Sequence, residues 1–154
     1  MSDWKRSTRE ISFDQLPSDV RAATQKHIAR YDLGSILSET LMSVQTDSEK
    51  VKKGLFGSVE VIHQGVVVTP RWLVWAVSGA KTPIAVLSAF LKDIVVQDYV
   101  TTSFAKMIPD SGIEVSGKFT DAGENASAFI GLENNVVGKR FIEVVIGAVQ
   151  NAKK

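Results

Sequence analysis

The clearest pattern of hydrophobic and polar residues lies near the C-terminal end of the chain. There, apolar side chains recur every three or four residues, which is the spacing of one helix face: Val137, Phe141, Val144, Val145, Ala148 and Val149. Asn134 or Asn135 can begin such a helix, because an asparagine side chain accepts a hydrogen bond from an amide of the first turn. We predict a helix from this point to about Asn151, with a wide apolar face that another element must cover.

Most of the chain before this helix has the pattern of β-strands. β-branched and aromatic residues dominate short segments, and residues that favour turns separate these segments from one another. The pattern predicts seven strands, with a turn at Lys92 and Asp93 between the fourth and the fifth: the second half of 35–49, then 59–69, 72–77, 83–91, 94–99, 113–119 and 126–132. Because no helix separates these strands, they favour an antiparallel arrangement.

The N-terminal part is divided between a tail and a first helix. Residues 1–15 are mostly polar and carry charges of both signs, so we expect a flexible N-terminal tail. From Pro17 to Tyr31 the apolar positions lie near one helix face, Pro17 suits a first turn, and Gly34 can end the helix. We expect residues 16–154 to form a single domain that includes this helix and the C-terminal one.

These elements together indicate an α+β fold. The apolar face of the C-terminal helix would cost about 1.5 to 3 kcal/mol for each large side chain left in water. The only large partner available is the sheet, so we expect a seven-stranded antiparallel sheet that curls into a partly open barrel. The C-terminal helix closes this barrel with Phe141 and Val145 pointing inward, and the N-terminal helix is an addition to it.

Composition narrows the class of protein. The chain has 154 residues, of which 44% are hydrophobic, and this suffices for one domain with a core. Its 18 basic and 17 acidic residues nearly cancel, and it has no cysteine for disulfides or thiolate chemistry. The first residues lack the apolar segment of a secretory signal, and no apolar run approaches the roughly 20 residues that span a bilayer. We therefore expect a cytoplasmic protein.

Two short motifs resemble those of the pleckstrin-homology-like (PH-like) superfold, which includes bacterial PH-like and GRAM-like domains. Residues 66–75, VVVTPRWLVW, resemble a strand, a turn with Thr and Arg, and an aromatic strand of these domains. Residues 89–94, AFLKDI, resemble their turn into the fifth strand. The resemblance extends over roughly residues 37–152 and implies seven strands closed by a C-terminal helix. It predicts architecture rather than activity, because this superfold hosts unrelated functions.

The resemblance also implies a site in the loop between the first two predicted strands, which is basic in lipid-binding members. Lys50, Lys52 and Lys53 occupy this loop, and Phe56 at its tip can enter a membrane interface. Each lysine near an anionic surface contributes about 1 kcal/mol. However, Glu60 stands in the following strand, where lipid-binding members usually have a basic residue. A solvated basic loop is therefore the first interpretation, and binding of anionic lipid is the alternative.

Two tryptophans are candidates for a protein contact. Trp72 and Trp75 lie three residues apart in a predicted strand, so their side chains point to opposite faces of the sheet. We expect one in the core and the other exposed at a contact, where large aromatic side chains contribute most. The alternative is that the sheet interior and the N-terminal helix cover both.

Candidates for catalysis are weak. His63 has no carboxylate partner at a recognisable spacing, so we interpret it as structural. His27 lies among polar residues of the first helix, and we interpret it as a surface or boundary residue. Two histidines so placed form no metal motif, and acidic residues interrupt the basic clusters that nucleic-acid binding requires. We therefore expect no enzymatic activity, no cofactor, no metal and no nucleic-acid partner.

Three hypotheses for function follow. The first is a non-catalytic interaction module that acts through protein–protein contacts or self-association into a homo-oligomer. The second is a peripheral membrane module that binds anionic lipid through the basic loop at residues 50–56. The third is a small-ligand carrier or an enzyme with a pocket at the barrel mouth.

Overall fold

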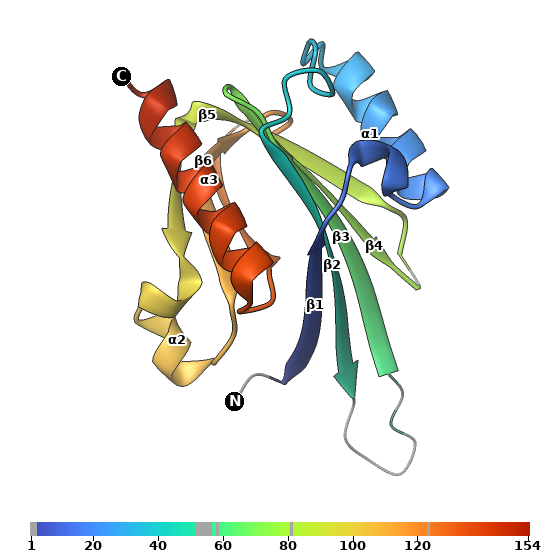
Figure 1. Ribbon diagram of the computed structural model, residues 1–154, viewed down its shortest axis with the longest axis vertical. Helices are drawn as coiled ribbons and strands as arrows, with labels where there is room; N and C mark the ends of the chain where they lie inside the picture. Colours follow the sequence, from blue (N-terminus) through green and yellow to red (C-terminus); the bar gives the residue numbers. More distant parts are fainter. Residues whose placement is uncertain (1–2, 52–56, 58, 81, 123) are drawn as a thin grey trace.

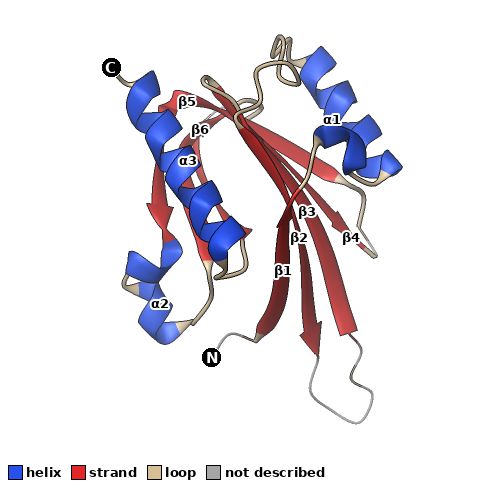
Figure 2. Ribbon diagram, in the orientation of Figure 1, coloured by secondary structure: helices blue, strands red, loops and turns tan. Residues whose placement is uncertain are grey.

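A computed structural model describes residues 3–51, 57, 59–80, 82–122 and 124–154 of the chain. These residues form one sheet and several helices (Figure 2). The strands are β1 (Trp4–Glu10), β2 (Met42–Val51), β3 (Val59–Val68), β4 (Trp72–Gly79), β5 (Ala85–Asp98), β6 (Gly112–Phe119) and β7 (Asn125–Gly131). The α-helices are α1 (Ser18–Arg30), α2 (Phe104–Met107) and α3 (Val136–Ala152), with the 3-10 helices η1 (Phe13–Gln15) and η2 (Tyr99–Thr101).

The seven strands follow one another in sequence order across the sheet, and each pair of neighbours is antiparallel. The sheet curls into a half-barrel, with α3 across its open side and α1 on the outside (Figure 1). The α+β fold predicted from the sequence, a curled seven-stranded sheet with one helix at each end, is therefore confirmed. The two helices lie against opposite faces of the sheet, so the sheet has a core on each side.

The inner core forms around α3. Asn135 begins this helix as predicted, because its Oδ1 accepts a hydrogen bond from the Gly138 amide at 2.8 Å. Phe141 and Val145 have no exposed surface and pack in one cluster with apolar side chains from β2 to β7. Trp75 belongs to the same cluster and meets the ring of Phe119 edge-on, with the centroids 5.3 Å apart. The apolar face of α3 thus fills the interior of the half-barrel.

The outer core lies beneath α1, on strands β3, β4 and β5. Phe13, Leu16 and Val20 pack there against apolar side chains on the outer face of the sheet, such as Val67 and Val74. A hydrogen bond adds to this contact. It joins Nε2 of the buried His27 on α1 to Oγ of Ser88 on β5, at 2.8 Å. The Ser88 hydroxyl donates to Thr120, so it accepts the proton of His27 Nε2. Burial lowers the pKa of His27, which favours this neutral form.

The N-terminal segment differs from its prediction. Residues 4–10, expected to belong to a flexible tail, form β1 and pair with β2 from Trp4 opposite Lys50 to Glu10 opposite Val44. Only Thr8 of this strand is buried, so β1 carries no apolar stripe that sequence analysis could recognise. Its position depends on backbone pairing with β2 and on polar side chains that reach the other edge of the sheet.

Strand β5 also differs from its prediction. The expected turn at Lys92 and Asp93 is an irregularity within one long strand, where the register with β6 shifts between Ala89 and Ile94. At this point the backbone of Asp93 passes directly over Gly117, whose φ of +138° favours glycine. A Cβ atom at position 117 would lie 2.2 Å from the Asp93 carbonyl oxygen. The sheet therefore has seven strands, but not the seven that were predicted. The predicted strands at 83–91 and 94–99 form the single strand β5, and β1 is an additional strand.

Side chains rather than a hydrogen-bonded ladder hold the two ends of the sheet together. Arg6 on β1 donates to both carboxylate oxygens of Asp110, at 2.8 Å and 2.6 Å, and to the Ser48 hydroxyl at 2.7 Å. The guanidinium of Arg6 also lies over the rings of Trp4 and Phe129, 5.2 Å and 5.5 Å from their centroids. Both members of the ion pair are about one-tenth exposed, so this contact is shielded from water.

A second set of hydrogen bonds links β1 to the segment between β7 and α3. The Thr8 amide donates to Oε1 of Glu133 at 2.9 Å, and the Glu133 amide donates to the Thr8 hydroxyl at 2.7 Å. Nδ2 of Asn135 donates to the Thr8 carbonyl at 3.2 Å and to Glu133 Oε1 at 3.0 Å. Asn135 therefore begins α3 and satisfies an edge-strand carbonyl at the same time. We call these contacts, with the Arg6–Asp110 pair, the seam.

The position of α3 leads to a prediction about stability. Replacing Phe141 by Ala should lower the free energy of unfolding by about 3 to 5 kcal/mol, because it leaves a cavity in the inner core. Urea denaturation followed by circular dichroism measures this change. The matched control is Val136→Ala in the first turn of the same helix, where the side chain is 82% exposed, and its effect should stay within about 0.5 kcal/mol. Equal effects of the two substitutions would contradict the placement of α3.

The seam leads to a second prediction. Arg6→Ala leaves the shielded Asp110 carboxylate without its partner, and such a loss costs about 3 to 5 kcal/mol. Arg9→Ala on the same strand removes an ion pair with Asp47 in which the arginine side chain is 51% exposed, so it should cost at most about 1 kcal/mol. Urea denaturation of the two variants side by side provides the comparison. A loss for Arg6→Ala no greater than that for Arg9→Ala would show that the seam does not stabilise the sheet.

Candidate functional site

The connection between β5 and β6 forms a compact projection from the sheet. It consists of residues 99–108, which include η2 and α2. The Tyr99 hydroxyl donates to the Ile108 carbonyl at 2.6 Å and thereby joins the two ends of the segment. The ring of Tyr99 lies 5.0 Å from that of Phe129 on β7, so the base of the projection rests on the sheet. The Thr101 hydroxyl donates to the Asp98 carbonyl at 2.7 Å, and the Asp98 side chain accepts from the Val100 amide at 3.3 Å, so both bonds fix the turn of η2.

This projection presents large apolar side chains to solvent. Val100 is 51% exposed, Phe104 56%, Ile108 65% and Met107 81%. Each would gain about 1.5 to 3 kcal/mol from complete burial, yet the chain itself covers none of them fully. Single exposed apolar residues are common, whereas several together on an ordered segment typically mark an interaction site. We call residues 99–108 the apolar projection.

A small groove separates the apolar projection from the start of α3. It has a volume of about 260 Å³, and Val100 lines one side while Ile142 of α3 lines the other. Glu133 and Glu143 contribute carboxylates to its rim, and Lys139 contributes an ammonium group. The groove thus continues from the apolar projection toward α3.

A second candidate is a polar cluster on the outer face of β1, β2 and β3. The strand register places Arg9 opposite Gln45 and Asp47 opposite His63, so four polar side chains meet. Asp47 accepts hydrogen bonds from Arg9 Nη1 at 2.9 Å, Gln45 Nε2 at 2.9 Å and His63 Nδ1 at 2.6 Å. Sequence analysis did not find this partner of His63, because the contact joins residues 16 apart across two strands.

The Asp47 carboxyl group is strongly stabilised in its ionised form. Partial burial by itself would raise the pKa of Asp47, but the hydrogen bonds from Arg9, Gln45 and His63 outweigh this effect and lower it to about 2. Because Asp47 accepts, Nδ1 of His63 carries a proton in this contact. The cluster therefore orients His63 on the surface of the sheet, where its side chain is 45% exposed.

The pKa of Asp47 leads to a pH-dependent prediction. The group stabilises the fold above its unfolded pKa of 3.8, and this contribution disappears as the pH falls through about 2. Asp47→Asn should therefore lower the unfolding free energy near pH 7 by at most about 1 kcal/mol, because the cluster is partly exposed. The difference from the parent should vanish near pH 2 in urea titrations. Asp3→Asn removes an exposed carboxylate of the same charge and controls for net charge; a difference independent of pH would refute the assignment.

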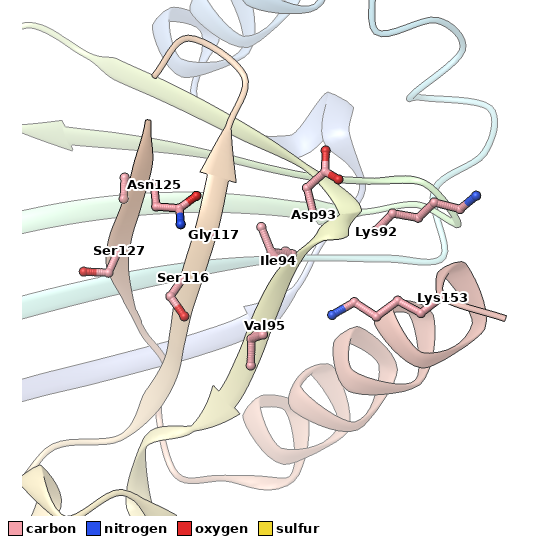
Figure 3. A pocket seen from close by; sticks show the side chains of 10 residues that line it. Lys92, Asp93, Ile94, Val95, Ser116, Gly117, Asn125, Ser127 and Lys153 are labelled. Atoms are coloured by element: carbon pink, nitrogen blue, oxygen red, sulfur yellow. The ribbon is translucent and has the colours of Figure 1, made fainter. Parts of the chain in front are cut away.

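A further cavity is a shallow groove beside the irregularity in β5 (Figure 3). Its volume is about 580 Å³, and residues from β5, β6, β7 and the end of α3 surround it. The polar side chains around it do not converge, since Lys92 and Ser127 point in opposite directions. An active site or ligand site normally has polar groups directed toward one point. The geometry of this groove therefore offers no constellation for catalysis.

The residues singled out from the sequence are distributed over several places. Trp75 is 2% exposed in the inner core, so it is not available as a contact residue. Trp72 is half-buried beside the outer core, with its ring 5.1 Å from that of Phe90. The structure thus supports the alternative that the fold largely covers both tryptophans. His27, expected near the surface, is buried against Ser88.

The basic loop can be described only at its beginning. Lys50 lies at the end of β2, with its Nζ 5.6 Å from the centre of the Trp4 ring. Lys52, Lys53 and Phe56 lie outside the described residues. Lipid binding by this loop stays a prediction from the sequence.

Comparison of the chain with protein-family models, curated proteins and solved structures gives no match in any of the three. No helix in the described part of the chain is long and apolar enough to cross a membrane. The same residues contain no group of three or more His, Cys, Asp or Glu side chains that could hold a metal ion. The PH-like resemblance therefore rests on the sequence motifs alone, and the apolar projection is the surface feature that most needs a functional explanation.

Proposed function

We propose that this chain is a non-catalytic interaction module of the PH-like type, which binds a protein partner through the apolar projection. The observation that carries the proposal is the exposure of Val100, Phe104, Met107 and Ile108 on a segment whose backbone is fixed by hydrogen bonds. A fixed backbone reduces the conformational entropy lost on binding, and large apolar side chains supply most of the energy of protein interfaces. Both features favour recognition of a partner.

The interior of the half-barrel supports a role without catalysis. Lipocalin-like barrels hold ligands in an open interior, whereas α3 fills this one with Phe141 and Val145. The larger grooves lie on the surface, and the polar side chains around the shallow groove point apart. A substrate would find no enclosed site there that excludes water. The expected cytoplasmic location is part of this proposal.

Charge favours a protein partner over an anionic membrane. Lys106 is the single basic residue of the apolar projection, and Asp98 stands at its base. One lysine near an anionic bilayer contributes only about 1 kcal/mol, and stable membrane anchoring generally needs two separate signals. Burial of the same apolar side chains against a protein surface contributes more binding free energy and is more specific.

A photo-cross-linking experiment tests the proposal. Phe104 is replaced by p-benzoylphenylalanine in cells that produce the chain, and light then links this side chain to whatever covers it. In the matched control, p-benzoylphenylalanine replaces Val95, which is 55% exposed on β5 outside the projection. We expect a protein adduct from position 104 and a much weaker one from position 95, measured as a mass shift on denaturing gels. The absence of a protein adduct at position 104, or an adduct with phospholipid alone, would refute the proposal.

A further inference from the structure

A groove elsewhere in the molecule has a form that suits the apolar projection. It lies where β1 ends and β2 begins, between Glu10, Ile11 and Ser12 on one side and Thr40, Met42 and Ser43 on the other. Its volume is about 350 Å³, which is within the range of roughly 300 to 1,000 Å³ typical of small binding pockets. We call it the acceptor groove.

Apolar surface continues from the acceptor groove onto the neighbouring turn. Leu41, between two lining residues, is 51% exposed, and Leu37 in the same connection is 46% exposed. Ile11, which is half-buried, lines the groove itself, and Met42 of the inner core lies beneath it with 4% of its surface exposed. The acceptor groove is therefore a hollow with an apolar rim, whereas the apolar projection is a protruding segment with apolar side chains.

The two surfaces lie apart on the molecule, so one chain cannot bring its own projection to its own groove. The connection between α1 and β2 is at the upper end of the long axis, and α2 is toward the lower end (Figure 1). A contact between them must join two molecules. Such a contact is heterologous, because it uses a different surface on each partner.

Charge favours this pairing over contact between two projections. Lys106 lies between Phe104 and Met107 in the projection and forms no ion pair with any described residue. Two projections packed together by a twofold axis would bring two such lysines close, and like charges oppose association. Beside the acceptor groove stand two carboxylates, Glu10 and Glu39, which are 45% and 43% exposed, and Glu10 is paired with Arg140 at 3.2 Å. Glu39 is held only by a 3.8 Å contact with Arg71, so it can accept a second cation.

We propose that the partner of the apolar projection is a second copy of this chain, and that the projection enters the acceptor groove of that copy. The inference rests on the proposed function and gives it a specific partner. Each molecule keeps one free projection and one free groove after the first contact, so association continues head to tail. One projection in one groove buries little surface, and the association is therefore weak and depends on protein concentration.

Size-exclusion chromatography with light scattering on four proteins tests the proposal. They are the parent, a projection variant (Phe104→Ser with Met107→Ser), a groove variant (Leu37→Ser with Leu41→Lys) and the control Val95→Ser. All substituted side chains are about half or more exposed, so the fold should tolerate them, and thermal unfolding verifies this. For the parent and the control we expect the average mass to rise steadily with concentration past that of two chains. The projection variant and the groove variant, each measured alone, should stay monomeric.

A mixture of the two defective variants is the decisive measurement. The intact projection of the groove variant can enter the intact groove of the projection variant. The mixture should therefore form dimers that contain one chain of each variant, and nothing larger. A parent that stays monomeric, a groove variant that still associates, or a mixture without pairs would overturn the inference.

The outcomes also separate this inference from the proposed function. A cross-link from position 104 to a different protein, with a monomeric parent, refutes self-association and leaves the interaction module intact. Sedimentation of the parent, but not of the projection variant, with vesicles of phosphatidylcholine and phosphatidylserine would assign the projection to a membrane. That result, together with a lack of protein cross-links, would refute both proposals.

Discussion

An antiparallel sheet that curls without closing must satisfy two edge strands that end up near each other. Here β1 and β7 occupy these edges, and side chains connect them where a closed barrel would have backbone hydrogen bonds. Arg6 is central to this arrangement, because it reaches Asp110 and Ser48 and lies over the rings of Trp4 and Phe129. Gly131 leaves room for the guanidinium, since a Cβ atom at this position would lie 2.3 Å from Arg6 Nη1 and would displace the arginine side chain. The seam thus fixes the curvature that α3 needs for burial.

The distribution of helices over the sheet explains which surfaces stay available. Helix α3 covers the inner face and α1 covers the outer face of β3, β4 and β5. Edge strand β1 carries charged side chains, which oppose pairing with a further strand. In addition, the carbonyl of Thr8 already accepts a hydrogen bond from the side chain of Asn135. The helices and the seam leave the connection between β5 and β6 uncovered, and they also leave Leu37 and Leu41 exposed in the connection between α1 and β2. The apolar side chains of the β5–β6 connection are therefore exposed by the architecture of the sheet as a whole.

The sequence predicted those parts of the fold in which burial follows a simple period. Phe141 and Val145 recur at helical spacing and are both fully buried, and strands such as β4 are rich in β-branched and aromatic residues. Strand β1 has a single buried residue, Thr8, so its pattern resembles that of a polar tail. The irregularity in β5 resembles a turn, because Lys92 and Asp93 are common in turns and the role of Gly117 depends on a distant backbone contact.

The candidate sites were harder to predict for a related reason. Asp47 and His63 meet only through strand register, and no local spacing reports such a contact. A signal for the apolar projection did exist in the sequence, where Phe104, Met107 and Ile108 interrupt a segment without a strand or helix period. Recognising it required knowing that the rest of the fold leaves this segment uncovered, and only the three-dimensional arrangement shows that.

The seam has a consequence for how the chain reaches its native state. β1 is synthesised first, yet its partners Asp110, Glu133 and Asn135 follow 104, 125 and 127 residues later. Contacts of such long range form slowly, because a large loop must close before they stabilise anything. A nascent chain on the ribosome can pair β1 with β2 early, but the curl stays open until α3 has left the exit tunnel. During that interval the inner face of the sheet lacks its covering helix, and apolar surface exposed in this way promotes aggregation.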